Sequence, residues 1–82
     1  MSHNKYKILL VEDEANIRNL VATVLDNAGY QTILATSCAG AKTLYASYTP
    51  DLIILDLGLP DADGMELLSF VRKESLTPII VL

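Results

Sequence analysis

Four apolar residues run directly into three acids in the segment Ile8-Leu9-Leu10-Val11-Glu12-Asp13-Glu14. An apolar run of this length without polar alternation is typical of a parallel strand that is buried on both faces. The pattern returns in a second run, Leu52-Ile53-Ile54-Leu55, which ends in Asp56. Two buried strands that each end in a carboxylate indicate an α/β sheet with acids gathered at one edge.

Two helical patterns lie between these runs. The first is an apolar stripe at helical spacing, which Gly29 ends as a C′ residue, and it consists of Ile17, Leu20, Val21, Val24, Leu25 and Ala28. The second helix is expected to begin after the N-cap residue Ser37 and to stop before Pro50. Its predicted buried face is made by Ala41, Leu44, Tyr45 and Tyr48.

Further elements complete a regular alternation. Residues 31–35 read as a strand, and Pro78–Leu82 reads as the last strand. Asp63 and Glu66 fit an aspartate form of the capping box, which predicts a third helix whose apolar positions are Leu67, Leu68 and Val71. The order βαβαβαβ predicts a doubly wound parallel sheet with right-handed crossovers and helices on both faces.

Composition narrows the class of protein. The chain has 82 residues, of which 51% are hydrophobic and 20% charged, so we expect one small folded domain. No apolar run is long enough to cross a bilayer, the start has no signal-peptide core, and the lone Cys38 forms no internal disulfide, which points to the cytoplasm. A net charge of −4 argues against direct binding of DNA or RNA.

The acids at the strand ends suggest a metal site. In an open parallel sheet, ligands bind beyond the carboxyl ends of the strands, where Glu12, Asp13 and Asp56 would meet. Three close carboxylates repel one another, and a bound hard divalent cation such as Mg²⁺ neutralises this repulsion. The alternative is that Asp13 or Glu14 only caps the first helix or faces solvent. The matching position of Asp56 favours the metal site.

Other chemistries lack their motifs. No glycine-rich phosphate loop follows the first strand, and a catalytic triad is excluded because His3, in the N-terminal tail, is the only histidine. Cys38 near a helix start could be an activated thiol, but a buried, unreactive cysteine is the simpler interpretation.

The quoted residues carry a resemblance to a known family. The segment 8–14 and the run Pro50-Asp51-Leu52-Ile53-Ile54-Leu55-Asp56-Leu57-Gly58-Leu59-Pro60-Asp61-Ala62-Asp63-Gly64 resemble the receiver domain of bacterial two-component response regulators. The longer run is most similar to that of the KdpE-type, OmpR-like transcriptional regulators. The resemblance implies the flavodoxin-like (CheY-like) fold. It also implies that residues 1–82 form an incomplete receiver domain, which ends within its fourth strand and lacks the last strand and the last two helices.

The resemblance also implies roles for single residues. Asp56 would be the phosphoacceptor nucleophile that takes phosphate from a sensor histidine kinase. Mg²⁺ would be bound by Asp13, Asp56 and the backbone carbonyl of Gly58, and by Glu12 through water. Phosphorylation would control a separate output domain that binds promoter DNA, with a homodimer formed on activation and no turnover of a separate substrate.

Two other functions remain open from the residues alone. A haloacid-dehalogenase-type phosphotransferase also uses an aspartate nucleophile at a strand end, but it requires a second acid two residues later, where this chain has Gly58. A flavodoxin-like binding module without phosphorylation is the other alternative, and the three matched acids argue against it.

Overall fold

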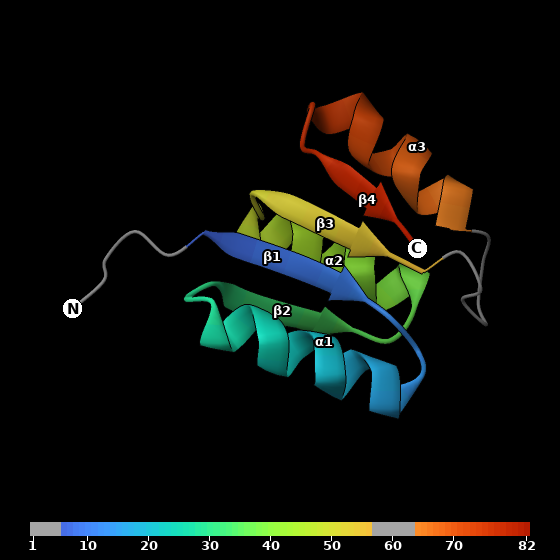
Figure 1. Cartoon of the computed structure of the whole chain (residues 1–82). Coiled ribbons are helices and arrows are strands. Elements are labelled where there is room, and N and C mark those ends of the chain that lie inside the picture. The colour runs from blue at the N-terminus through green and yellow to red at the C-terminus, as the bar shows by residue number, and fades with distance from the viewer. Residues whose placement is uncertain (1–5, 57–63) are drawn as a thin grey trace.

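The computed structural model describes residues 6–56 and 64–82. Its elements follow the predicted order: β1 (Lys7–Val11), α1 (Ala15–Asn27), β2 (Gln31–Ala35), α2 (Cys38–Tyr48), β3 (Leu52–Leu55), α3 (Gly64–Glu74) and β4 (Ile79–Val81). The four strands form one parallel sheet in the order β2-β1-β3-β4 (Figure 1). The doubly wound fold class predicted from the sequence is confirmed.

Helices cover the two faces of the sheet unequally (Figure 1). On one face, α2 and α3 pack on a core whose strand residues are Leu9, Val11, Ile33, Ala35, Ile53 and Leu55. On the other face, α1 packs through Val21, Ala22 and Leu25 on a smaller core. Every residue from Leu9 to Val11 is fully buried because β1 is central and both of its faces are covered.

Local sequence signals set the ends of α1 and α2. Gly29 has a φ of 94°. The amide of the next residue, Tyr30, donates a hydrogen bond to the Leu25 carbonyl, which completes a Schellman motif. The Ser37 side chain accepts a hydrogen bond from the Gly40 amide, 3.1 Å away, at the start of α2. Both predicted caps are confirmed, whereas Asp63, the predicted cap of α3, lies outside the described residues.

Some residues predicted to pack in the core are exposed. Leu20 and Val24 of α1 are 67% and 59% exposed, and Ile17 also faces solvent. The reason is that α1 lies over β1 and β2, so only one side of its broad apolar stripe meets the sheet. Tyr48 is likewise exposed because it lies in the last turn of α2. Periodicity identified these helices correctly but overestimated how much of each apolar stripe is buried.

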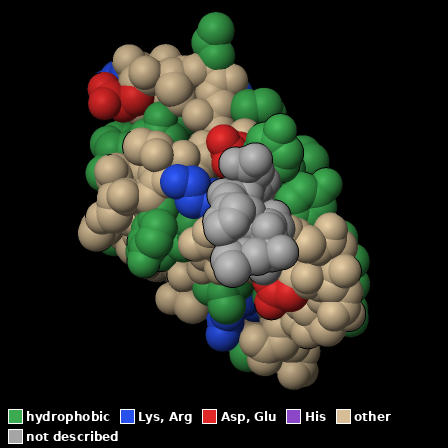
Figure 2. All heavy atoms as spheres, turned by 90° about the vertical axis from the view of Figure 1, so that its left-hand side faces the viewer, with side chains coloured by type: hydrophobic (Ala, Val, Ile, Leu, Met, Phe, Trp, Pro, Cys, Tyr) green, Lys and Arg blue, Asp and Glu red, His purple; other side chains and the backbone are tan. Residues whose placement is uncertain are grey.

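The face of β3 and β4 beside α1 is an open apolar surface. A groove of about 450 Å³ there is lined mostly by apolar side chains, namely Tyr6, Ile8, Leu25, Tyr30, Leu52, Ile54 and Ile80, with Asp51 at its border. In Figure 2, which looks onto the ends where the strands begin, hydrophobic side chains gather along the right-hand edge. No charged residue occurs from Thr77 to Leu82, so β4 brings no charge to this surface or to the sheet edge.

We therefore expect the 82-residue chain to associate with itself in solution at micromolar concentration. Burial of exposed apolar surface gains roughly 25 cal/mol per Å², and an uncharged edge strand is free to pair. Sedimentation equilibrium should show dimers or larger species, and Ile80→Lys should weaken association at least about tenfold, or about 1.4 kcal/mol. Leu76→Lys is the control, since Leu76 is 89% exposed and lies outside the groove. A monodisperse monomer with one sharp unfolding transition would contradict this expectation.

Candidate functional site

Two backbone hydrogen bonds place the acids at the strand ends. In the parallel register, Val11 of β1 lies opposite Leu55 of β3. The ladder continues one residue further, because the Asp56 amide donates to the Val11 carbonyl at 3.0 Å. On the other side of β1, the Glu12 amide donates to the Ala35 carbonyl of β2, also at 3.0 Å. Glu12 and Asp56 are therefore held next to each other by the sheet itself.

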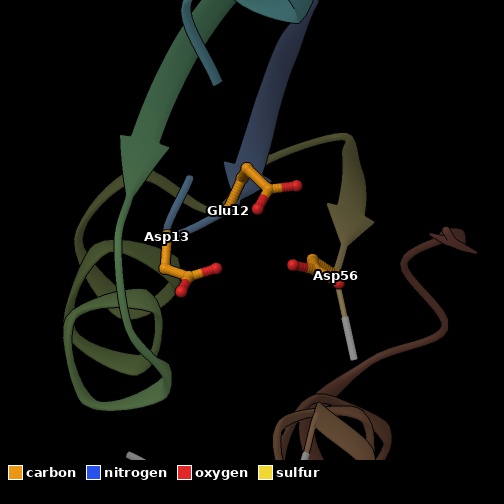
Figure 3. Close-up of side chains that lie close together, drawn as sticks. All are labelled: Glu12, Asp13 and Asp56. Carbon is orange, nitrogen blue, oxygen red and sulfur yellow. The ribbon is translucent and has the colours of Figure 1, made fainter. Parts of the chain in front are cut away.

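The three predicted acids come together. Glu12, Asp13 and Asp56 each offer a carboxylate oxygen, and these three oxygens lie within 4.8 Å of one another. Figure 3 shows the side chains turned toward a common space beyond the ends of β1 and β3. Glu12 is buried with 3% exposure, Asp56 is half-buried and Asp13 is exposed. The cluster is thus open to a small ligand on the side of Asp13.

Burial raises the pKa of Glu12 above its ordinary value of 4.5. A hydrogen bond with the Asp56 carboxyl group and the negative charges of Asp56 and Asp13 raise it further, while a hydrogen bond from the Glu14 amide opposes the rise. That amide donates to Oε2 of Glu12 at 3.1 Å. The charge of ionised Glu12 therefore lacks full compensation within the protein, so a bound cation would be favoured here.

The donor set fits Mg²⁺. All three side chains offer oxygen atoms, which Mg²⁺ prefers, and the open side leaves room for the waters that this ion retains. The alternative in which Asp13 or Glu14 caps α1 has little support, because Glu14 occupies the N-cap position without a side-chain capping bond and Asp13 lies one residue before it. The geometry therefore favours a metal site over a capping role.

Metal-free protein should lose stability as pH rises through the pKa of Glu12. This carboxyl group binds its proton more tightly in the folded state, so its contribution is fully present below 4.5 and is lost as pH rises through the higher folded pKa. Urea unfolding in the presence of a chelator, from acidic to neutral pH, measures this loss. Glu12→Gln should remove this part of the pH dependence, and Glu14→Gln, at an exposed neighbour, should keep it. Identical profiles for wild type and Glu12→Gln would contradict the effect.

Arg18 forms hydrogen bonds to the loop that carries two acids of the cluster, and it was not among the residues predicted from the sequence. Its Nη1 atom donates to the carbonyl oxygens of Glu12 and Asp13 at 3.1 and 3.2 Å. The one feature of the sequence that could have pointed to Arg18 is that it is the only basic residue between Lys7 and Lys42. Nothing in the spacing showed that it turns back onto the preceding loop.

Three residues considered in the sequence remain to be placed: Gly58, His3 and Cys38. Gly58 and His3 lie outside the described residues. Cys38, the first residue of α2, is buried in the core, in agreement with the interpretation of a buried, unreactive cysteine. A second hollow of about 470 Å³ lies at the opposite ends of the strands, lined by Tyr45, Ala46, Thr49, Pro50, Phe70, Glu74, Ser75 and Thr77. In the described part of the chain, no helix is both long and apolar enough for a membrane span.

Comparison with known proteins identifies the family. Residues 8–82 match the model of the response regulator receiver domain. The chain is 44% identical over 75 residues to the KDP operon transcriptional regulatory protein KdpE of Escherichia coli, which covers 92% of this chain and 33% of that protein. It is 40% identical over 82 residues to the probable transcriptional regulator ycf27 of Cyanophora paradoxa, covering 100% of this chain and 34% of the relative. The chain thus spans about a third of the length of these relatives.

Solved structures agree with the family match. The chemotaxis response regulator CheY4 of Vibrio cholerae superposes with a TM-score of 0.91 at 32% identity, covering 95% of this chain and 68% of that one. The BeF3-activated receiver domain of Klebsiella pneumoniae RstA gives a TM-score of 0.87 at 32% identity, covering 92% and 64%. These matches favour a receiver domain over the dehalogenase-type enzyme and the non-phosphorylated binding module. The chain belongs to the response regulator receiver domain family.

Proposed function

We propose that Asp56 accepts a phosphoryl group from the phosphohistidine of a sensor histidine kinase, in a reaction that depends on Mg²⁺ bound at the acid cluster. The observation that carries the proposal is the meeting of three carboxylate oxygens, from the ends of two neighbouring strands, within 4.8 Å. Asp13 and Asp56 would bind the ion directly, and the buried Glu12 would act through water. The family membership supports these roles.

Asp56 is suited to act as the nucleophile. It is half-buried at the end of β3, and its backbone is anchored to β1, so its carboxylate is held at the open edge of the sheet. An Asp56 oxygen attacks phosphorus in line as the bond between phosphorus and the histidine nitrogen breaks, which leaves an acyl phosphate on the chain. Bound Mg²⁺ would neutralise charge on the phosphoryl oxygens. Since the phosphoryl group stays on the protein until it is hydrolysed, we expect no turnover of a separate substrate.

The names and lengths of the relatives support a wider role. Several of them are named as transcriptional regulators, and they are about three times as long as this chain. We infer that phosphorylation of this cytoplasmic domain controls a separate output domain that binds promoter DNA. The negative charge of this chain argues against DNA binding by the receiver itself. A homodimer formed on activation is part of the same proposal.

Acetyl phosphate provides the direct test. The product of the complete gene, incubated with acetyl phosphate and Mg²⁺, should gain one phosphoryl group by intact-mass spectrometry. Hydroxylamine should remove that group, because acyl phosphates are labile to it, and a chelator should prevent its addition. Incorporation that resists hydroxylamine, or that proceeds unchanged in chelator, would contradict the proposal.

A further inference from the structure

A single arginine ties together the loop that carries two of the three acids. The loop of residues 12–14 joins β1 to α1, and Arg18 lies one turn into that helix. Its Nη1 atom reaches back to two consecutive carbonyl oxygens, those of Glu12 and Asp13, at 3.1 and 3.2 Å. One guanidinium group thus fixes the peptide planes on both sides of the Asp13 α-carbon.

This bridge acts on the side chains through the backbone. The Asp13 side chain is exposed, so its direction is set mainly by the backbone that bears it. The Glu12 carboxylate is oriented by the Glu14 amide, 3.1 Å from its Oε2 atom, and that amide belongs to the same loop. Release of the bridge would free both carboxylates from their common geometry with Asp56.

We propose that Arg18 is a positioning residue for the metal site, which it preorganises by bridging the Glu12 and Asp13 carbonyls. The inference rests on the proposed function, because it concerns the affinity of the same acid cluster for Mg²⁺. Ligand-orienting groups that do not touch the metal typically contribute 10- to 100-fold in affinity.

The loss of the positive charge of Arg18, taken alone, would change the Mg²⁺ affinity in the opposite direction. Removal of a positive group near a cation site should strengthen cation binding, because the local potential becomes more negative. Loss of positioning should weaken binding. The sign of the change therefore separates the two effects of replacing Arg18.

Arg72 offers a matched control at the other end of the sheet. Its Nη1 atom also bridges two carbonyl oxygens of a loop, those of Ser75 and Thr77, at 3.4 and 2.7 Å. Both arginines follow the same design, a helix side chain that holds the adjoining loop, and substitution of either changes the net charge equally. Only the loop held by Arg18 carries acids of the cluster.

The test compares Arg18→Met and Arg72→Met with wild type in the product of the complete gene. Methionine keeps an unbranched apolar stem and removes the donors. Mg²⁺ titration, followed through the amide NMR signals of the cluster residues, should show roughly 10-fold weaker binding for Arg18→Met and unchanged binding for Arg72→Met. Thermal unfolding of each variant measures any general loss of stability.

A metal-free measurement gives an independent readout. In chelator, the Glu14 amide should exchange its hydrogen faster in Arg18→Met than in wild type or Arg72→Met, since its partner Glu12 is no longer held in place. Unchanged or tighter Mg²⁺ binding by Arg18→Met, or equal weakening in both variants, would overturn the positioning role and leave the proposed function standing. If wild type fails to bind Mg²⁺ at the cluster, the proposed function falls, and this inference falls with it.

Discussion

Asp56→Asn is expected to reduce phosphorylation by acetyl phosphate at least roughly 1,000-fold, because the amide cannot act as the nucleophile. Asparagine has nearly the same shape as aspartate, so the end of β3 should be preserved. The substitution also removes one of the negative charges that raise the pKa of Glu12. Metal-free Asp56→Asn should therefore be at least as stable as wild type by urea unfolding, which excludes misfolding as the cause of lost activity.

Asp51→Asn is the matched control for this substitution. Asp51 directly precedes β3 at the opposite end of the strand, and its Oδ2 atom accepts a hydrogen bond from the Lys7 amide at 2.8 Å. An asparagine side chain retains an oxygen that can accept the same bond. Phosphorylation should proceed normally in Asp51→Asn. Undiminished incorporation in Asp56→Asn would eliminate Asp56 as the phosphoacceptor.

Asp13→Ala is expected to weaken Mg²⁺ binding at least roughly 30-fold, equivalent to about 2 kcal/mol. Asp13 is the exposed member of the cluster and would touch the ion directly, so its loss removes both a ligand and a negative charge. The measurement is a Mg²⁺ titration by calorimetry, at an ionic strength that screens distant surface charges.

Glu14→Ala supplies the comparison for Asp13→Ala. Glu14 is the next residue, is also exposed, and loses the same charge on substitution, but its side chain neither belongs to the cluster nor caps α1. We expect its Mg²⁺ affinity to stay within a few-fold of wild type. Equal losses in the two variants would mean that general negative charge, rather than coordination by Asp13, accounts for the binding.

The parts of the fold that depend on local signals could be predicted from the sequence. The apolar runs predicted β1 and β3 because a strand covered on both faces is apolar along its buried length. Gly29 and Ser37 ended and began helices at the expected positions, since backbone conformation and capping bonds depend on neighbouring residues. The meeting of Glu12 with Asp56 also followed, because parallel register aligns the ends of adjacent strands.

Features that depend on packing could not be predicted in this way. The stripe of α1 shows which residues are apolar, but whether Leu20 is buried depends on which strands the helix covers. The ion pair between Glu66 of α3 and Lys42 of α2, whose Oε1 and Nζ atoms are 3.2 Å apart, likewise depends on how two helices pack together. Arg18 was missed because its bond to the preceding loop requires knowledge of how the chain turns between β1 and α1.

Binding of beryllofluoride, a mimic of the phosphoryl group, tests whether Asp56 and Mg²⁺ at the acid cluster form one phosphoryl site. Fluorine NMR of the product of the complete gene should show a bound beryllofluoride signal in wild type with Mg²⁺. This signal is expected to disappear when Mg²⁺ is removed and to be absent in Asp56→Asn. A bound signal that persists in Asp56→Asn, or that forms equally well without Mg²⁺, would contradict the assignment of such a site.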